Sequence, residues 1–66
     1  MTEIKMLNLT LEQIKKNAEN FNYPYDITEC ADNSGNCLTV YQSMYRQIHY
    51  YFDKNDICVD VEVEEI

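Results

Sequence analysis

The stretch "RQIHYYFDKNDICVDVEVEE", residues 46–65, decides the fold of this chain. On each side of a short polar segment, apolar and polar residues alternate, and a period of two is typical of a β-strand that buries one face. The turn is expected at Lys54–Asn55 within the polar segment, because these residue types favour turns. The sequence therefore predicts two antiparallel strands joined as a hairpin.

The alternation also predicts which residues of this hairpin stand opposite each other. Pairing Phe52 with Ile57 fixes the register. The apolar face then holds two further pairs, Tyr50–Val59 and Ile48–Val61. The other face holds the pairs His49–Asp60, Gln47–Glu62 and Tyr51–Cys58. A slip by one residue would mix apolar and polar side chains on both faces, so the pattern specifies this register.

The first strand of the hairpin allows a second interpretation. In "VYQSMYRQIHYYF" the apolar residues at 41, 44, 45, 48 and 52 also have helical spacing. The Tyr, Ile and Val content, the register with residues 57–63 and the turn at 53–56 favour a strand instead. We therefore predict a strand, with a turn or a bulge around Gln42–Ser43.

Residues 9–21, "LTLEQIKKNAENF", are expected to form a helix. Thr10 is a good N-cap, and Gln13 three residues later completes a capping box. Pro24 disfavours helical geometry at the residue before it and so ends the helix. The apolar stripe of this helix comprises Leu11, Ile14, Ala18 and Phe21.

Residues 25–41, "YDITECADNSGNCLTVY", predict a first hairpin with its turn at 32–35. A four-residue loop there would place Cys30 directly opposite Cys37. The same register would also give the pairs Thr28–Thr39 and Ile27–Val40.

Together these segments predict an α+β fold in a single domain, residues 1–66: one N-terminal helix packed on a small antiparallel sheet of three to four strands, built from two consecutive hairpins. The segment "EIKML", residues 3–7, could add a short edge strand. Besides the helix stripe, the expected core comprises Ile27, Leu38, Val40, Ile48, Tyr50, Phe52, Val59 and Val61.

The chain is acidic, with a formal net charge of −7. Between Asp53 and Glu65 lie six acidic residues and one base, Lys54. Such a balance repels nucleic acid and anionic membranes, and it suits either a basic protein partner or simple solubility. The sequence shows neither a secretory signal nor an apolar run long enough to span a membrane, so we expect a cytoplasmic location.

Three cysteines and the single histidine are the residues to weigh for metal or catalytic chemistry. Cys30, Cys37, Cys58 and His49 would share one sheet face in the expected register, but they lack the closely spaced cysteine pairs of structural zinc sites. We therefore expect three thiols and no metal or cofactor. His49 with Cys58 and Asp60 has the residue types of a nucleophilic site, yet no glycine-rich turn or helix N-terminus is placed to hold an oxyanion. The prediction is a protein that is not an enzyme.

The strongest functional signal lies on the face of the sheet that turns away from the core. This face combines tyrosines, which offer rigid half-polar contact area, with a row of carboxylates. The candidate partner-binding residues are Tyr41, Tyr45, His49, Tyr51, Asp60, Glu62 and Glu64. Carboxylates on one strand face repeat every 6.6–6.8 Å or so, a spacing of the same order as that of phosphates along a nucleic-acid strand.

In composition the chain resembles phage-encoded inhibitors, including anti-restriction and anti-CRISPR proteins, which are small, acidic and rich in Tyr and Asn. That resemblance implies a protein-binding module that blocks a basic, nucleic-acid-binding site on its partner. One alternative is a small structural protein that forms a homodimer through the Tyr- and Cys-rich sheet face. A second alternative is a metal or redox protein that uses its cysteines.

Overall fold

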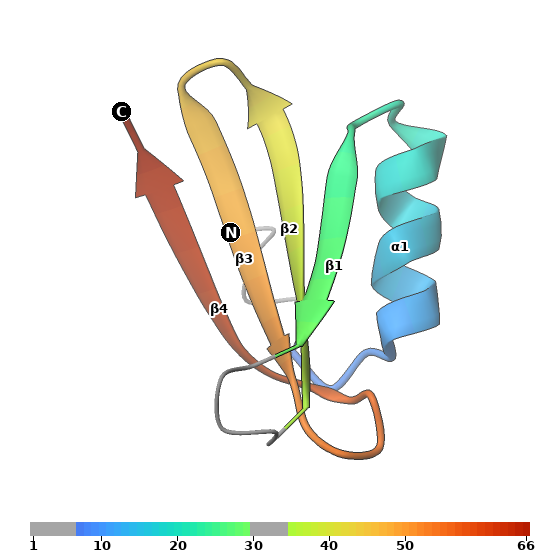
Figure 1. The fold of residues 1–66 in the computed structure, drawn as a ribbon. Helices are drawn as coiled ribbons and strands as arrows, with labels where there is room; N and C mark the ends of the chain where they lie inside the picture. Colours follow the sequence, from blue (N-terminus) through green and yellow to red (C-terminus); the bar gives the residue numbers. More distant parts are fainter. Residues whose placement is uncertain (1–6, 30–34) are drawn as a thin grey trace.

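The computed structural model describes residues 7–29 and 35–66. Along the chain lie the helix α1 (Leu11–Asn20) and the strands β1 (Tyr25–Glu29), β2 (Asn36–Ser43), β3 (Arg46–Phe52) and β4 (Cys58–Glu65). The strands form one antiparallel sheet in the order β1-β2-β3-β4. Figure 1 shows this twisted sheet with α1 on one side of it. The predicted α+β fold of one helix and two consecutive hairpins is confirmed, and residues 46–52 form a strand rather than a helix.

The helix begins and ends as its sequence predicts. The Thr10 hydroxyl accepts a hydrogen bond from the Gln13 amide at 3.2 Å, and the Gln13 side chain accepts one from the Thr10 amide at 2.8 Å. This reciprocal capping box satisfies two amides that have no partner inside the helix. At the other end Asn22 takes a left-handed conformation, with φ of 60°, and the chain leaves the helix before Pro24.

The core lies between α1 and one face of the sheet, here called the covered face. Ile14 and Ala18 of the helix are buried there against β2 and β3. The buried sheet residues comprise Leu38, Val40, Ile48, Tyr50, Phe52 and Cys58. Leu11 and Val61 pack at the margin of this cluster. No helix in the described part of the chain is long and apolar enough to cross a membrane.

Three residues expected in the core are exposed, namely Phe21, Ile27 and Val59. Phe21 follows the last turn of α1, where it stacks on Tyr23 with ring centroids 5.7 Å apart instead of entering the core. Ile27 belongs to the edge strand β1 and faces the buried Leu38, but it remains exposed. An apolar stripe predicts which way a side chain points. Its burial also requires another helix or strand that covers it.

The register of the first hairpin differs from the predicted one by two residues. Ile27 stands opposite Leu38, and Thr28 stands opposite Cys37. A shift of two leaves every side chain on its expected face, because the side-chain period is also two. Cys30 lies outside the described residues, but its expected place opposite Cys37 belongs to Thr28.

The second hairpin has a longer turn than predicted. The Asp53 carboxylate accepts hydrogen bonds from the amides of Asn55, at 2.8 Å, and Ile57, at 3.1 Å, and Asp56 takes a left-handed conformation. Ile57 therefore bridges to Thr10 instead of pairing with Phe52. An Asx-type turn of this kind satisfies its own amides locally and so delays the start of strand pairing.

A bulge at the start of β4 then changes which residues face the core. Phe52 pairs with Cys58, whereas Tyr51 pairs with Asp60, so Val59 is an extra residue on β4. Cys58 is consequently buried in the core, and Val59 is 57% exposed, the reverse of the expected placement. Beyond the bulge the observed pairs are Tyr50–Val61, His49–Glu62, Ile48–Val63 and Gln47–Glu64, each two residues from the predicted register.

The only glycine of the chain, Gly35, stands where the two hairpins approach each other. A Cβ atom at this position would overlap the carbonyl oxygen of Phe52 and come within 2.9 Å of that of Asp53. Its φ of +156° also disfavours other residues. The backbone of β2 can therefore begin close to the end of β3 because Gly35 has no side chain.

Candidate protein-binding surface

The face of the sheet opposite α1, here called the open face, gathers most of the predicted binding residues. Strand pairing places directly opposite residues on the same face, so the pairs that flank buried residues define it. The open face comprises Asp26, Thr28, Cys37, Thr39, Tyr41, Gln47, His49, Tyr51, Asp60, Glu62 and Glu64. Six of the seven predicted site residues therefore share one surface.

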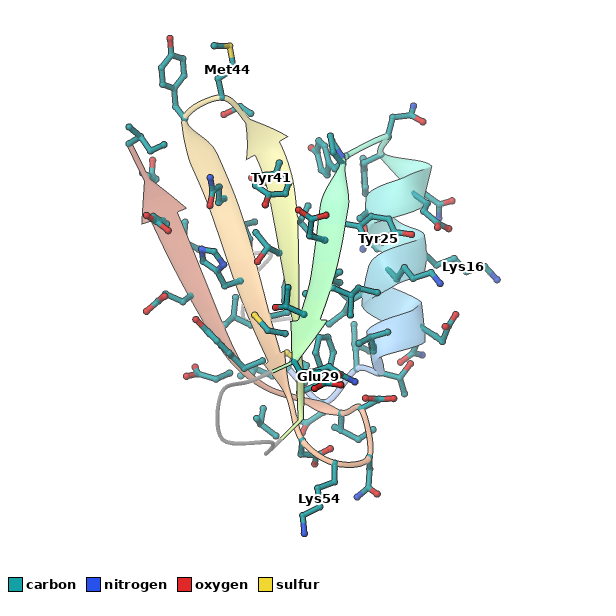
Figure 2. The ribbon with its side chains drawn as sticks, in the orientation of Figure 1. Lys16, Tyr25, Glu29, Tyr41, Met44 and Lys54 are labelled. Carbon is teal, nitrogen blue, oxygen red and sulfur yellow. The ribbon has the colours of Figure 1, made fainter. Side chains whose placement is uncertain are left out.

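Tyr45 is the exception among the predicted site residues. It lies with Met44 in the turn between β2 and β3, and both side chains are largely exposed. Figure 2 shows Met44 at the tip of this hairpin, beyond the end of the sheet. A bulge between Tyr41 and Ser43 shifts the register there, so the strand alternation that predicts Tyr45 on the open face stops before this residue.

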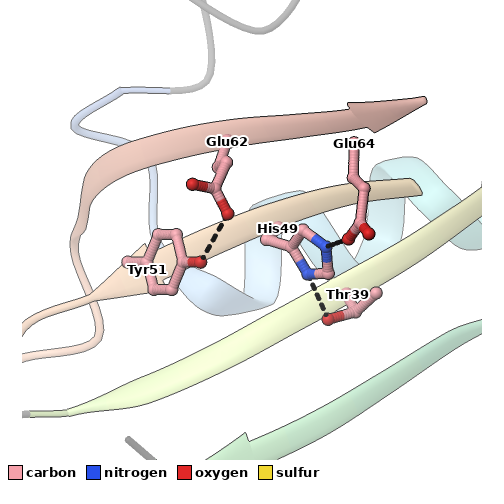
Figure 3. Close-up of polar contacts among 5 residues, drawn as sticks. All are labelled: Thr39, His49, Tyr51, Glu62 and Glu64. Atoms are coloured by element: carbon pink, nitrogen blue, oxygen red, sulfur yellow. Dashed lines mark hydrogen bonds and ion pairs between the residues drawn. The ribbon is translucent and has the colours of Figure 1, made fainter. Parts of the chain in front are cut away.

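On β3 and β4, tyrosine and histidine side chains hold two of the carboxylates in place. The Tyr51 hydroxyl donates to Glu62 at 3.2 Å, and His49 Nε2 lies 3.1 Å from the Glu64 carboxylate. Figure 3 shows both contacts crossing from β3 to β4. The carboxylates of β4 are therefore oriented by neighbours rather than extended individually into water.

The contacts continue across β2 to β1. His49 Nδ1 lies 2.9 Å from the Thr39 hydroxyl, and the Tyr41 hydroxyl donates to Asp26 at 3.0 Å. Because a carboxylate only accepts hydrogen bonds, Nε2 of His49 carries the proton toward Glu64. In the neutral ring Nδ1 is then an acceptor, and the Thr39 hydroxyl donates to it.

The phenols of the open face keep their protons at neutral pH. The hydrogen bond to Asp26 is the main reason that the pKa of Tyr41 lies above its ordinary value. For Tyr51, burial raises the pKa most, and the charge of Glu62 and the hydrogen bond to it raise it further. Both hydroxyls therefore remain donors that hold carboxylates over the whole neutral range.

Thr39, His49 and Glu64 together place a hydroxyl, an imidazole and a carboxylate in the order of a hydrolytic triad. Catalysis would also need donors for an oxyanion close to the hydroxyl. Thr39, however, lies in the middle of β2, which pairs with a strand on each side, so the main-chain amides around it belong to the sheet ladder. This arrangement favours a structural role over a catalytic one: the hydrogen bonds among the three side chains fix their orientation on the open face.

The two described cysteines lie on opposite faces of the sheet, and only Cys37 shares the open face with His49. Cys58 lies in the core, where its thiol donates to the Asp60 carbonyl at 3.4 Å and burial raises its pKa. Cys37 lies on the open face opposite Tyr51, and Cys30 is outside the described residues. Within residues 7–29 and 35–66, no group of three His, Cys, Asp or Glu side chains is placed to hold a metal ion.

The charges around the open face are unevenly distributed. Asp60, Glu62 and Glu64 are all exposed on β4. Lys16 extends from α1 and Lys54 from the turn before β4, both away from this row (Figure 2). The acidic row is therefore the dominant charged feature of β4.

Sequence reasoning missed two members of the surface network. Asp26 holds Tyr41, and Thr39 holds His49. The predicted alternation places Thr39 on this face, and the predicted register of the first hairpin would set Asp26 directly opposite Tyr41. In the observed register Asp26 stands opposite Thr39, and Tyr41 is its diagonal neighbour. No protein-family model matches the chain, and comparisons with curated proteins and with solved structures give no significant match.

Proposed function

We propose that this protein is a non-enzymatic binding module whose open face occupies a basic site on a partner protein, as an inhibitor of nucleic-acid binding would do. The observation that carries the proposal is the row Asp60, Glu62 and Glu64, two of whose carboxylates are held by Tyr51 and His49. Oriented charges beside rigid tyrosines lose little conformational freedom when a partner docks, and that saving favours binding.

The charge pattern indicates the kind of partner. The three carboxylates repeat along β4 at about 6.6–6.8 Å, which is roughly twice the axial spacing of phosphates on one nucleic-acid strand. A groove lined with Lys and Arg for a phosphate backbone would therefore meet charges at compatible intervals. Long-range attraction between this row and such a groove would mainly speed association.

The competing explanation is that the acidic row only keeps the protein soluble. Acids are disfavoured in strands, and like charges two residues apart on one face repel each other, so threonine would suit a merely solvated strand better. Solubility also does not require a fixed orientation of the carboxylates, whereas hydrogen bonds orient both Glu62 and Glu64. These observations favour a contact role for the row.

The proposal is tested by capturing partners from the cells that make this protein, with and without nuclease treatment. One bait is the wild-type chain, and the second is the open-face triple variant Asp60→Gln, Glu62→Thr, Glu64→Gln. The third is a charge-matched control in which three exposed acids off the open face are replaced, namely Glu12→Gln, Glu19→Gln and Glu29→Gln.

We expect the wild type and the control to capture the same basic protein, which added DNA or RNA displaces, and the open-face variant to lose it. The same set of proteins on all three baits would contradict the proposal. The homodimer alternative has a separate signature: sedimentation would show a dimer of the wild type and no captured partner.

A further inference from the structure

Among the described residues, no strand pairs with the outer edge of β4 over most of its length. Within the described residues β4 pairs only with β3, and the order of the sheet ends there. The Ile66 amide donates to the Tyr45 carbonyl at 2.9 Å, which marks this pair as hydrogen-bonded. In an antiparallel ladder such pairs recur at every second residue. Glu64, Glu62 and Asp60 therefore direct their main-chain groups toward β3, whereas Val61, Val63 and Glu65 direct theirs outward.

The first part of this edge already accepts an extended segment of the chain itself. The Cys58 amide donates to the Leu9 carbonyl at 2.8 Å, and the Asn8 amide donates to the Cys58 carbonyl at 2.9 Å. Thr10 also forms an antiparallel bridge with Ile57. In the described part of the chain this pairing stops at Cys58, three residues before the outward-facing groups of Val61.

The side chains along the remaining edge differ on its two faces. On the covered side Val63 is 37% exposed, so α1 does not cover this end of the sheet, and Glu65 is the next residue on the same side. On the open side the same strand carries only carboxylates, Asp60, Glu62 and Glu64. A strand added here would bury apolar residues against Val61 and Val63, and it would place its alternate residues beside the acidic row.

A second copy of this chain is a poor occupant of that edge. In an antiparallel pair of β4 strands centred on Glu62, two Glu62 residues would face each other and Asp60 would face Glu64. Like charges directly opposite each other destabilise a strand pair, and charged residues on an edge commonly prevent such self-association. The chain as a whole also carries a net charge of −7.

We propose that the outer edge of β4, from Val61 to Glu65, binds an extended segment of a partner protein as an antiparallel fifth strand, in which Lys or Arg alternates with Val, Ile or Leu. Strand addition of this kind takes affinity from main-chain hydrogen bonds and specificity from alternate side chains. This inference rests on the proposed function, because it assumes a basic partner and specifies how that partner docks.

The test uses two synthetic peptides of identical composition, acetyl-VKVKVKV-amide and acetyl-VVKKKVV-amide, titrated into the full chain while amide signals are followed by NMR. The alternating peptide should bind at least about tenfold more tightly than the rearranged one, with slower hydrogen exchange at the Val61 and Val63 amides. In an antiparallel strand the valine amides of the peptide face β4. N-methylation of the valines should therefore abolish binding, whereas N-methylation of the lysines should leave it nearly unchanged.

Equal binding of the two peptides would overturn the added strand and leave the open-face proposal standing, since the acidic row would then attract positive charge without strand pairing. Binding of neither peptide would also overturn it. The capture experiment with the open-face triple variant would still decide the proposed function by itself, because it does not depend on strand addition.

Discussion

The two faces of the sheet are built from the same strands but held by different interactions. On β3, Ile48, Tyr50 and Phe52 point to the covered face and are almost completely buried. Their neighbours on the same strand, His49 and Tyr51, point to the open face and make cross-strand hydrogen bonds at a half-buried surface. Successive residues of one strand therefore belong to different environments.

The difference shows where the stability of the protein resides. Complete burial of an Ile or Phe side chain contributes about 1.5–3 kcal/mol. A hydrogen bond made in place of one to water contributes a net of only about 0.5–1.5 kcal/mol. The covered face should therefore tolerate little change, and the open face can carry residues chosen for contact with a partner.

The largest effect is expected from substitutions at two adjacent residues of β3. Ile48→Ala removes a side chain that is 1% exposed and should cost about 2–5 kcal/mol of unfolding free energy, enough to threaten a domain of this size. His49→Ala removes two cross-strand hydrogen bonds worth about 0.5–1.5 kcal/mol each, so it should cost about 1–3 kcal/mol and less than Ile48→Ala. Urea unfolding of both variants measures the two losses of unfolding free energy. Equal losses would contradict the claim that the covered face contributes most of the stability.

An intermediate effect is expected at the two described cysteines, which the bulge places on opposite faces. Cys58→Ser puts a hydroxyl in the core and should cost about 1–3 kcal/mol, whereas Cys37→Ser on the open face should cost less. In the native protein the buried Cys58 thiol, whose pKa is raised, should also react with iodoacetamide at least about tenfold more slowly than Cys37. Mass mapping of alkylated peptides would contradict the observed register if the two reacted equally.

The smallest effect concerns the phenols of the open face at high pH. The pKa values of Tyr41 and Tyr51 are raised in the folded state, so both groups hold their protons more firmly there than in the unfolded chain. Their contribution to stability should therefore be complete below about pH 10, the ordinary tyrosine pKa, and should be lost as the pH rises through the folded values.

Unfolding measurements of the wild type and of the double variant Tyr41→Phe, Tyr51→Phe check this pH dependence. The wild type should lose stability more steeply above about pH 10 than the variant does, and tyrosinate absorbance should show the delayed ionisation directly. Parallel curves for the two proteins would show that these phenols do not couple to folding.

Much of the fold could be predicted because it follows from local patterns. The capping box at Thr10 and Gln13 and the period of two in β3 need only neighbouring residues. The predicted register of the second hairpin was wrong because a side chain, Asp53, fixes a longer turn, and a bulge at Val59 then moves Cys58 into the core. Nothing in the alternation marks that bulge.

The candidate surface could be predicted nearly as well as the fold, for a specific reason. The observed register is displaced by two residues beyond the bulge, and a displacement of two preserves the face of every side chain. Asp60, Glu62 and Glu64 therefore lie on the predicted face, although His49 meets Glu62 and Glu64 there instead of Asp60. Individual contacts depend on exact register, whereas the composition of a face does not.

The separation of stability from binding is tested most directly by titrating the captured basic partner into the wild type, the open-face triple variant and the charge-matched control. The variant should remain folded, and its affinity should fall at least about tenfold and lose much of its salt dependence between about 50 and 200 mM. The control, with the same loss of three negative charges from −7, should bind like the wild type. A folded open-face variant that binds as tightly as the control would contradict the assignment of binding to this face.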